Sequence, residues 1–148
     1  MSLSRHLLFG LAGAAFASMA IPCEAMDAGT QEAALQCDSP DMNTPQRTEC
    51  WEKRAALEIS RMQKSYRRAI AAAKAMATDG GFPDLSPEIK TAQGHWKNFE
   101  KAQCDLESDA TLGSAAGIAG SVCSERLTHE RAESLDALAD GFEMMASK

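Results

Sequence analysis

The stretch Ala92-Gln93-Gly94-His95-Trp96, followed by Cys104, Cys123 and Leu127-Thr128, decides the fold of this 148-residue chain. Apolar residues recur every three or four positions on both sides of the run Gly113-Ser114-Ala115-Ala116-Gly117. This spacing is typical of amphipathic helices, and a run of such small residues permits a sharp turn. The stretch therefore predicts two helices that are joined by a Gly-rich connection and fastened by a disulfide. It shows no pattern of catalytic residues.

The first 25 residues have the order of a secretory signal peptide: a basic start, an apolar run over residues 7–21, and small residues up to Ala25. The apolar run is too short and too rich in Ala and Gly for a membrane span. Cleavage after Ala25 is preferred to cleavage after Ala20, because it removes Cys23 and leaves an even number of cysteines. Lipoproteins need a small residue directly before the lipid-modified cysteine. The proline before Cys23 therefore argues against a lipid anchor.

The mature chain, residues 26–148, has the length of one domain with one core. The net charge is −6, and aromatic residues make up only 5% of the sequence. Ala, Leu, Met, Glu and Lys are common, whereas Val and Ile are scarce, and this composition favours helices. We expect a single all-α domain. A secreted and acidic chain also argues against nucleic acid as a partner.

Three helical segments are predicted from the spacing of apolar residues. The first starts at Thr44-Pro45, with Thr44 as its cap, and stops at Asp79-Gly80-Gly81. The second starts at Ser86-Pro87, with Ser86 as its cap, and the third becomes clear near Val122. We expect their apolar stripes to pack as an antiparallel bundle. The stripes are Trp51, Ala55, Ile59, Met62, Tyr66, Ala69, Ile70, Ala73 and Ala77; Leu85, Ile89, Ala92, Trp96, Phe99, Gln103 and Leu106; and Leu127, Leu135, Leu138, Phe142 and Met145.

Charge is distributed unevenly along the chain. Residues 44–78 hold eight basic and three acidic side chains, whereas residues 79–148 hold six basic and thirteen acidic ones. The favoured interpretation is intramolecular, with a basic first helix lying against acidic later helices. The alternative is that the acidic half meets a cationic protein, in which case it would raise the association rate.

The four cysteines of the mature chain, Cys37, Cys50, Cys104 and Cys123, allow three disulfide pairings. Sequential pairing is favoured, because each bridge then closes a short loop near a helix end. The alternative, a metal site, is disfavoured because the spacings fit no zinc motif. No nucleophile elbow, phosphate loop or paired-cysteine redox motif is present. We therefore expect no catalytic residue, metal or cofactor, and we expect the two histidines of the mature chain at the surface.

Several residues follow one another in an informative order: Cys50, Tyr66, Ala92-Gln93, Trp96, Cys104, Gly113-Ser114, Cys123, Leu127-Thr128 and Arg131. Their cysteine order and the motifs Ala-Gln-x-x-Trp and Thr-x-x-Arg resemble the LprI-like lysozyme-inhibitor family. The resemblance extends from Cys37 to about Leu138. It implies a small helical, disulfide-held envelope protein and, for some members, inhibition of lysozyme. It also implies a structural role for the motif residues Tyr66, Gln93, Trp96, Thr128 and Arg131.

The chain departs from the family pattern at four positions. Ile59, Met62 and Gln63 stand where the family tends to have Asp, Leu and Asn before the tyrosine. Glu100 stands where the family tends to have Arg, four residues after the tryptophan. These changes leave the scaffold intact, but a function that depends on those polar residues does not carry over.

The expected function is periplasmic, non-enzymatic inhibition of c-type lysozyme or a related peptidoglycan-cleaving enzyme. Such lysozymes are cationic and cut with two carboxyl groups in a cleft. An inhibitor must fill that cleft and give the acid a hydrogen-bond partner, and loops on a rigid scaffold usually carry such contacts. Gly113 and Ser114 are the first choice, and the turn from Asp79 to Asp84 is the second. The alternative is an envelope interaction module, such as an immunity or assembly protein, with a different protein partner.

Overall fold

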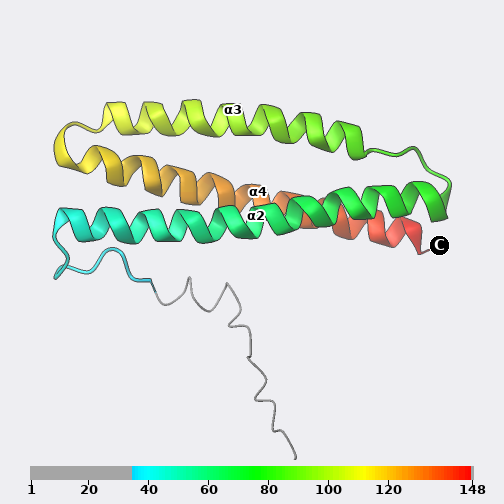
Figure 1. The fold of residues 1–148 in the computed structure, drawn as a ribbon, viewed down its shortest axis with the longest axis horizontal. Coiled ribbons are helices and arrows are strands. Elements are labelled where there is room, and N and C mark those ends of the chain that lie inside the picture. The colour runs from blue at the N-terminus through cyan, green and yellow to red at the C-terminus, as the bar shows by residue number, and fades with distance from the viewer. Residues whose placement is uncertain (1–34, 148) are drawn as a thin grey trace, which may run out of the picture.

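Three long helices form the computed structural model, which describes residues 35–147 (Figure 1). They are α2 (Thr44–Gly80), α3 (Ser86–Ala110) and α4 (Ala116–Ala146), and the short 3₁₀ helix η1 (Gly113–Ala115) precedes α4. No strand occurs within residues 35–147, and two disulfides hold the chain. The predicted all-α, disulfide-held fold is therefore confirmed. The predicted signal peptide, including Cys23, lies outside the described residues.

Consecutive helices run in opposite directions, so that α2 and α4 lie parallel and side by side (Figure 1). Hydrogen bonds join Arg54 to Glu125, Ser65 to Asp136 and Arg68 to Glu143, in the same order along both helices. The α2–α4 contact is the most extensive in the bundle, and α3 packs mainly on α4. Because α3 touches α2 only slightly, the two helices leave a groove between them.

The start of α2 is fixed by a capping box at Asn43, and not by the hydroxyl of Thr44 that the sequence predicted. The backbone N–H of Gln46 donates to Asn43 Oδ1 at 3.1 Å, and the backbone N–H of Asn43 donates to Gln46 Oε1 at 2.9 Å. This reciprocal pair satisfies two backbone donors that the first helical turn would otherwise leave without partners. Pro45 lies in the first turn, as predicted.

Replacing Asn43 with alanine should lower the free energy of unfolding by about 1 kcal/mol, because the helix loses its cap. Thr44→Ala is the matched control and should change the stability little, since Thr44 provides no capping bond. Urea unfolding followed by circular dichroism measures both. A larger loss for Thr44→Ala than for Asn43→Ala would contradict this assignment of the cap.

In the connection between α2 and α3, the predicted end of α2 is confirmed, whereas the predicted cap of α3 is wrong. Gly81 adopts the left-handed conformation with φ 70°, which ends α2 where the sequence predicted a stop. Ser86, however, does not cap α3, because it is itself the first helical residue and is buried. Leu85 occupies the N-cap position without a side-chain cap, and the Oδ1 atom of the preceding Asp84 accepts the backbone N–H of Ser86 at 2.8 Å.

The main core lies between α2 and α4 and is built largely from small side chains. Alanines that are fully buried on both helices let the two backbones approach closely, and larger residues fill the space around them. The buried members of this cluster are Met62, Ala69, Ala72, Ala73, Met76, Ile89, Ala132, Leu135, Ala139 and Phe142.

Several residues of the predicted apolar stripes prove to be exposed. Ile59 is 39% exposed on α2, Phe99 and Leu106 are 53% and 62% exposed on α3, and Leu138 is 40% exposed on α4. On α3 the predicted stripe is only partly buried: Ile89 lies in the core and Leu85 and Trp96 pack against it, whereas Ala92 also lies on the exposed side. The helix instead turns Gln93 and Cys104 inward, because their bonds to α4 determine which side is buried.

The sequence predicted a basic first helix lying against the acidic later helices, and the structure shows this pairing between α2 and α4. The guanidinium group of Arg54 lies 2.6 Å from a carboxylate oxygen of Glu125. Further along α2, Arg68 lies 2.6 Å from Glu143 and also pairs with Asp140. Part of the acidic half of the chain is therefore neutralised within the molecule.

Candidate functional site

Both predicted disulfides are confirmed. Cys37–Cys50 ties the N-terminal segment to the start of α2, where Trp51 is buried beside the bridge. Cys104–Cys123 joins the last turns of α3 to the first turns of α4. The second bridge therefore lies next to the connection that contains Gly113 and Ser114.

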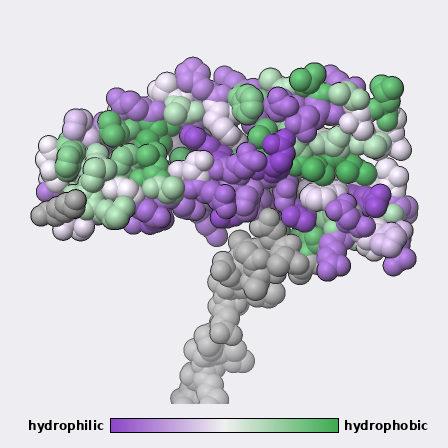
Figure 2. Space-filling model, turned by 180° about the vertical axis from the view of Figure 1, so that it is seen from behind, coloured by the Kyte–Doolittle hydropathy of each residue, from purple (hydrophilic) through white to green (hydrophobic). Residues whose placement is uncertain are grey.

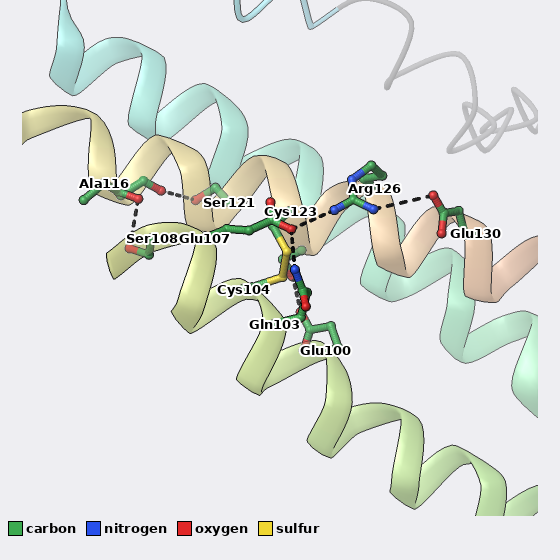
Figure 3. The surroundings of a disulfide bond; sticks show 12 residues. Glu100, Gln103, Cys104, Glu107, Ser108, Ala116, Ser121, Cys123, Arg126 and Glu130 are labelled. Carbon is green, nitrogen blue, oxygen red and sulfur yellow. Dashed lines mark hydrogen bonds and ion pairs between the residues drawn. A yellow bond between two sulfur atoms is a disulfide. The ribbon is translucent and has the colours of Figure 1, made fainter. Parts of the chain in front are cut away.

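The connection between α3 and α4 is braced on several sides (Figure 3). The Ser108 hydroxyl donates to the carbonyl oxygen of Ala116 at 3.0 Å, and Arg126 pairs with Glu107 at 3.0 Å. At Gly120 the helices come so close that an added Cβ would lie 3.5 Å from the Ser108 Cβ. The Cys104–Cys123 disulfide and these polar contacts therefore hold the end of α3 against the start of α4, which forms the base of the connection.

The residues that project from this base form the α3–α4 turn, which we define as Thr111–Ala115. Leu112 is 89% exposed, and Gly113 adopts the left-handed conformation with φ 78°. Gly113 and Ser114, the first sequence choice, are both exposed. Sequence reasoning missed Leu112. The available signal was an apolar residue next to a glycine and outside every helical stripe.

An apolar hollow adjoins the α3–α4 turn. It has a volume of about 510 Å³, and apolar side chains of α4, including Ile118 and Val122, form part of its lining. Figure 2 shows hydrophobic residues gathered towards both ends of one face of the bundle, with a hydrophilic band between them. The turn thus combines an exposed leucine with neighbouring apolar surface.

The second sequence choice, the turn from Asp79 to Asp84, lies at the opposite end of the bundle (Figure 1). Asp84 already accepts the backbone N–H of Ser86 at the start of α3, and this hydrogen bond holds the pKa of the Asp84 carboxyl below its ordinary value. Helix α3, which has 25 residues, separates the two turns. That number of residues corresponds to about 37 Å. One enzyme cleft therefore cannot receive both turns.

The residues of the family motif meet near the middle of the bundle. The Nε–H of Arg131 donates to Gln93 Oε1 at 2.9 Å, and its guanidinium carbon lies 6.0 Å from the centre of the Trp96 ring. Gln93 and Thr128 are buried, and Tyr66 packs against the main core. This arrangement links α3 to α4 and supports the structural role that we expected.

A buried carboxylate on α2 was not anticipated from the sequence. Glu58 is fully buried, and its Oε1 atom lies 3.3 Å from Nδ1 of His129 and 3.6 Å from Arg61. His95 is exposed as expected, but His129 is only partly exposed. Glu58 could have been found from its spacing, because it continues the alternation of three and four residues that leads to Met62 and Ser65.

The contact between His129 and Glu58 should make stability depend on pH. Partial burial lowers the pKa of His129, but the hydrogen bond to Glu58 and the negative charge of Glu58 outweigh burial, and the pKa is raised above its ordinary value of 6.5. Protonated His129 therefore stabilises the fold below pH 6.5, and this contribution is lost as pH rises through the raised pKa.

The matching measurement compares wild type with His129→Gln by urea unfolding at pH 5.5 and pH 8.5. We expect the stability advantage of wild type to be larger at pH 5.5 than at pH 8.5. An advantage that is equal at both values, or larger at pH 8.5, would contradict the assigned direction.

A groove of about 480 Å³ runs between α2 and α3. It is lined by residues from all three helices: Ile59, Met62, Gln63 and Tyr66; Lys90, Gln93, Gly94, Trp96, Lys97 and Glu100; and Thr128. The four positions at which the chain departs from the family pattern all lie in this lining. The departures that were scattered along the sequence therefore share one surface.

Residues 35–147 contain no group of three or more His, Cys, Asp or Glu side chains that could hold a metal ion. No helix within the same residues is long and apolar enough to cross a membrane. The described groups instead define a small all-α domain that two disulfides hold and that presents a braced, partly apolar turn.

The chain belongs to the lysozyme inhibitor LprI family, whose profile matches residues 36–135. This match confirms the resemblance seen in the cysteine order and the two short motifs. It begins beside Cys37 and covers both disulfides and all of α2 and α3. No curated protein and no solved structure shows significant similarity to the chain.

Proposed function

We propose that this protein is a periplasmic, non-enzymatic inhibitor of c-type lysozyme or a related peptidoglycan-cleaving enzyme. Membership of an inhibitor family supports the inhibitory role. The signal-like order of residues 1–25 supports export and a mature single domain of residues 26–148. The two disulfides are consistent with an oxidising compartment.

The observation that carries the proposal is the presentation of Leu112, which is 89% exposed in the braced α3–α4 turn. A braced turn loses little conformational freedom when it binds, so more of its contact energy remains as affinity. Leu112 supplies apolar surface for an enzyme cleft. The neighbouring Ser114 hydroxyl supplies a hydrogen-bond partner for a catalytic carboxyl group.

The charge near the turn fits a cationic partner. The last two turns of α3 carry Asp105, which pairs with Lys101, Glu107, which pairs with Arg126, and Asp109, and the final turn contains no basic residue. A helix C-terminus is also the negative end of the helix dipole, so acidic side chains there add to the same negative potential. A negative potential of this kind would speed the encounter with a cationic lysozyme.

Binding kinetics on immobilised c-type lysozyme test the proposal. Raising the ionic strength from about 0.01 M to 0.15 M shortens the screening length from about 30 Å to about 8 Å. We expect slower association at the higher salt and a nearly unchanged dissociation rate. Asp105→Asn/Asp109→Asn should also slow association, whereas the control Glu88→Gln, in the first turn of α3, should have a smaller effect. Absence of a complex at both salt concentrations would contradict the proposal and favour a different envelope partner.

A further inference from the structure

The groove between α2 and α3 has the size and composition of a ligand pocket. Its volume of about 480 Å³ lies within the range of small-molecule sites, which often occur between the helices of bundles. Ile59 and Tyr66 from α2 and Trp96 from α3 supply apolar surface, and the buried Met62 and Thr128 contribute to its lining.

The charged lining of the groove has the opposite sign to the protein as a whole. Lys90 and Lys97 are exposed on α3, and neither forms an ion pair within residues 35–147. They stand seven residues apart, which places them on nearly the same side of the helix at a separation of about 10 Å along its axis. The single carboxylate of the lining, Glu100, accepts a hydrogen bond from Ser124 at 2.6 Å.

Gly94 widens the groove without serving helix packing. A Cβ added at this position would meet no atom within 4 Å, so no neighbouring helix requires a glycine there. A glycine in the middle of a helix also makes the helix less stable than an alanine would. Because Gly94 belongs to the groove lining, its missing side chain leaves room for a ligand.

Gln93, a buried polar residue of the groove lining, already has hydrogen-bond partners. The buried Gln93 side chain accepts a hydrogen bond from Arg131 and donates one to the sulfur of Met62. A polar head group would therefore gain little by entering deeply. The two lysines, in contrast, are open to solvent and to an anion.

We propose that this groove binds a small amphipathic carboxylate of the medium-chain fatty-acid type. Its apolar chain lies between α2 and α3 against Tyr66 and Trp96. Its carboxylate lies near Lys90 and Lys97, where the positive charges match it. This site is separate from the α3–α4 turn, which lies at the end of the bundle.

Decanoate and its uncharged counterpart 1-decanol are the probes, added to the oxidised full-length protein and followed by amide chemical shifts. We expect decanoate to shift the amide signals of residues 59–66 and 90–97 and to bind more tightly than 1-decanol. A lack of shifts, or shifts confined to other residues, would overturn the proposal.

Two variants separate the apolar and ionic parts of the site. Gly94→Leu fills the groove and should weaken the binding of both probes at least tenfold. Gly141→Leu is the matched control, because Gly141 on α4 also has open space around its Cβ position and lies outside the groove. Equal binding by Gly94→Leu and wild type would overturn the proposal.

Lys90→Gln/Lys97→Gln should weaken decanoate binding about three- to tenfold, as expected for two solvent-exposed ion pairs, and leave 1-decanol binding unchanged. Lys53→Gln/Lys101→Gln removes the same charge from exposed positions outside the lining and should have little effect. An equal loss for both probes, or for both lysine pairs, would contradict the placement of the carboxylate. The lysine variants keep the proposal testable if Gly94→Leu does not fold.

Discussion

Replacing Ser114 with tryptophan should weaken lysozyme binding at least a hundredfold while the protein stays folded. Ser114 is exposed and supports no core residue, so the bundle tolerates a large side chain there. A rigid enzyme cleft does not, because the indole would hold the rest of the α3–α4 turn away from it. Ser114→Ala removes one hydroxyl and should cost about 1 kcal/mol of binding free energy. Dissociation rates and melting temperatures measured for both variants separate binding from folding.

Asp79→Trp is the control for a bulky exposed residue at the other end of the bundle, where Asp79 lies in the last turn of α2. It introduces the same side chain at the opposite end of α3, and we expect it to bind lysozyme as wild type does. If Ser114→Trp binds normally, the α3–α4 turn is not the inhibitory element. If Asp79→Trp is the variant that fails, the turn from Asp79 to Asp84 takes that role.

Removing the Cys104–Cys123 bridge, by Cys104→Ala/Cys123→Ala, should lower both stability and binding. The bridge closes a loop with a sequence separation of 19 residues. The chain-entropy model assigns about 3 kcal/mol of folding stability to a loop of this length. The bridge also braces the α3–α4 turn, so its loss should speed dissociation from lysozyme even for molecules that remain folded.

Cys37→Ala/Cys50→Ala provides the comparison, because its loop has a similar sequence separation of 13 residues. It should lose about 3 kcal/mol of stability as well, but it leaves the turn braced and should dissociate from lysozyme at the wild-type rate. Urea unfolding and dissociation rates at a temperature where both variants are folded provide the two readouts. Equal dissociation rates for the two bridge variants would contradict the role of the brace.

The parts of the fold that depend on local chemistry could be predicted from the sequence. Gly81 ended α2 where expected, since a left-handed residue is needed there and glycine adopts that conformation easily. The order of the cysteines predicted both bridges correctly. At the start of α2 the prediction was one residue late, because the Asn43 amide and the Thr44 hydroxyl are both capable caps and only the local geometry selects Asn43.

The parts that depend on packing between helices could not be predicted in the same way. Phe99 and Leu106 form a regular stripe on α3, yet the bonds of Gln93 and Cys104 to α4 turn that stripe to the outside. Glu58 was left out of the predicted apolar stripe of α2, yet it is buried and lies against His129 of α4. An apolar period is thus a reliable sign of a helix but a weaker sign of which face is buried.

The candidate site also has a part that local chemistry predicts and a part that depends on packing between helices. The run of small residues identified Gly113 and Ser114 as a turn, but it gave no indication that Leu112 would stand fully outside the core. The groove at Gly94 could not be anticipated, because it arises from the preference of α3 for α4 over α2. Such a preference is set by the whole bundle and not by any single motif.

Cell-wall lysis by c-type lysozyme, titrated with the purified and oxidised protein, tests the central claim most directly. We predict that the lysis rate falls in proportion to added protein and reaches its minimum near one molecule per lysozyme. Ser114→Trp should leave the rate high over the same range. An unchanged rate of lysis at a large molar excess of the wild-type protein would contradict its assignment as a lysozyme inhibitor.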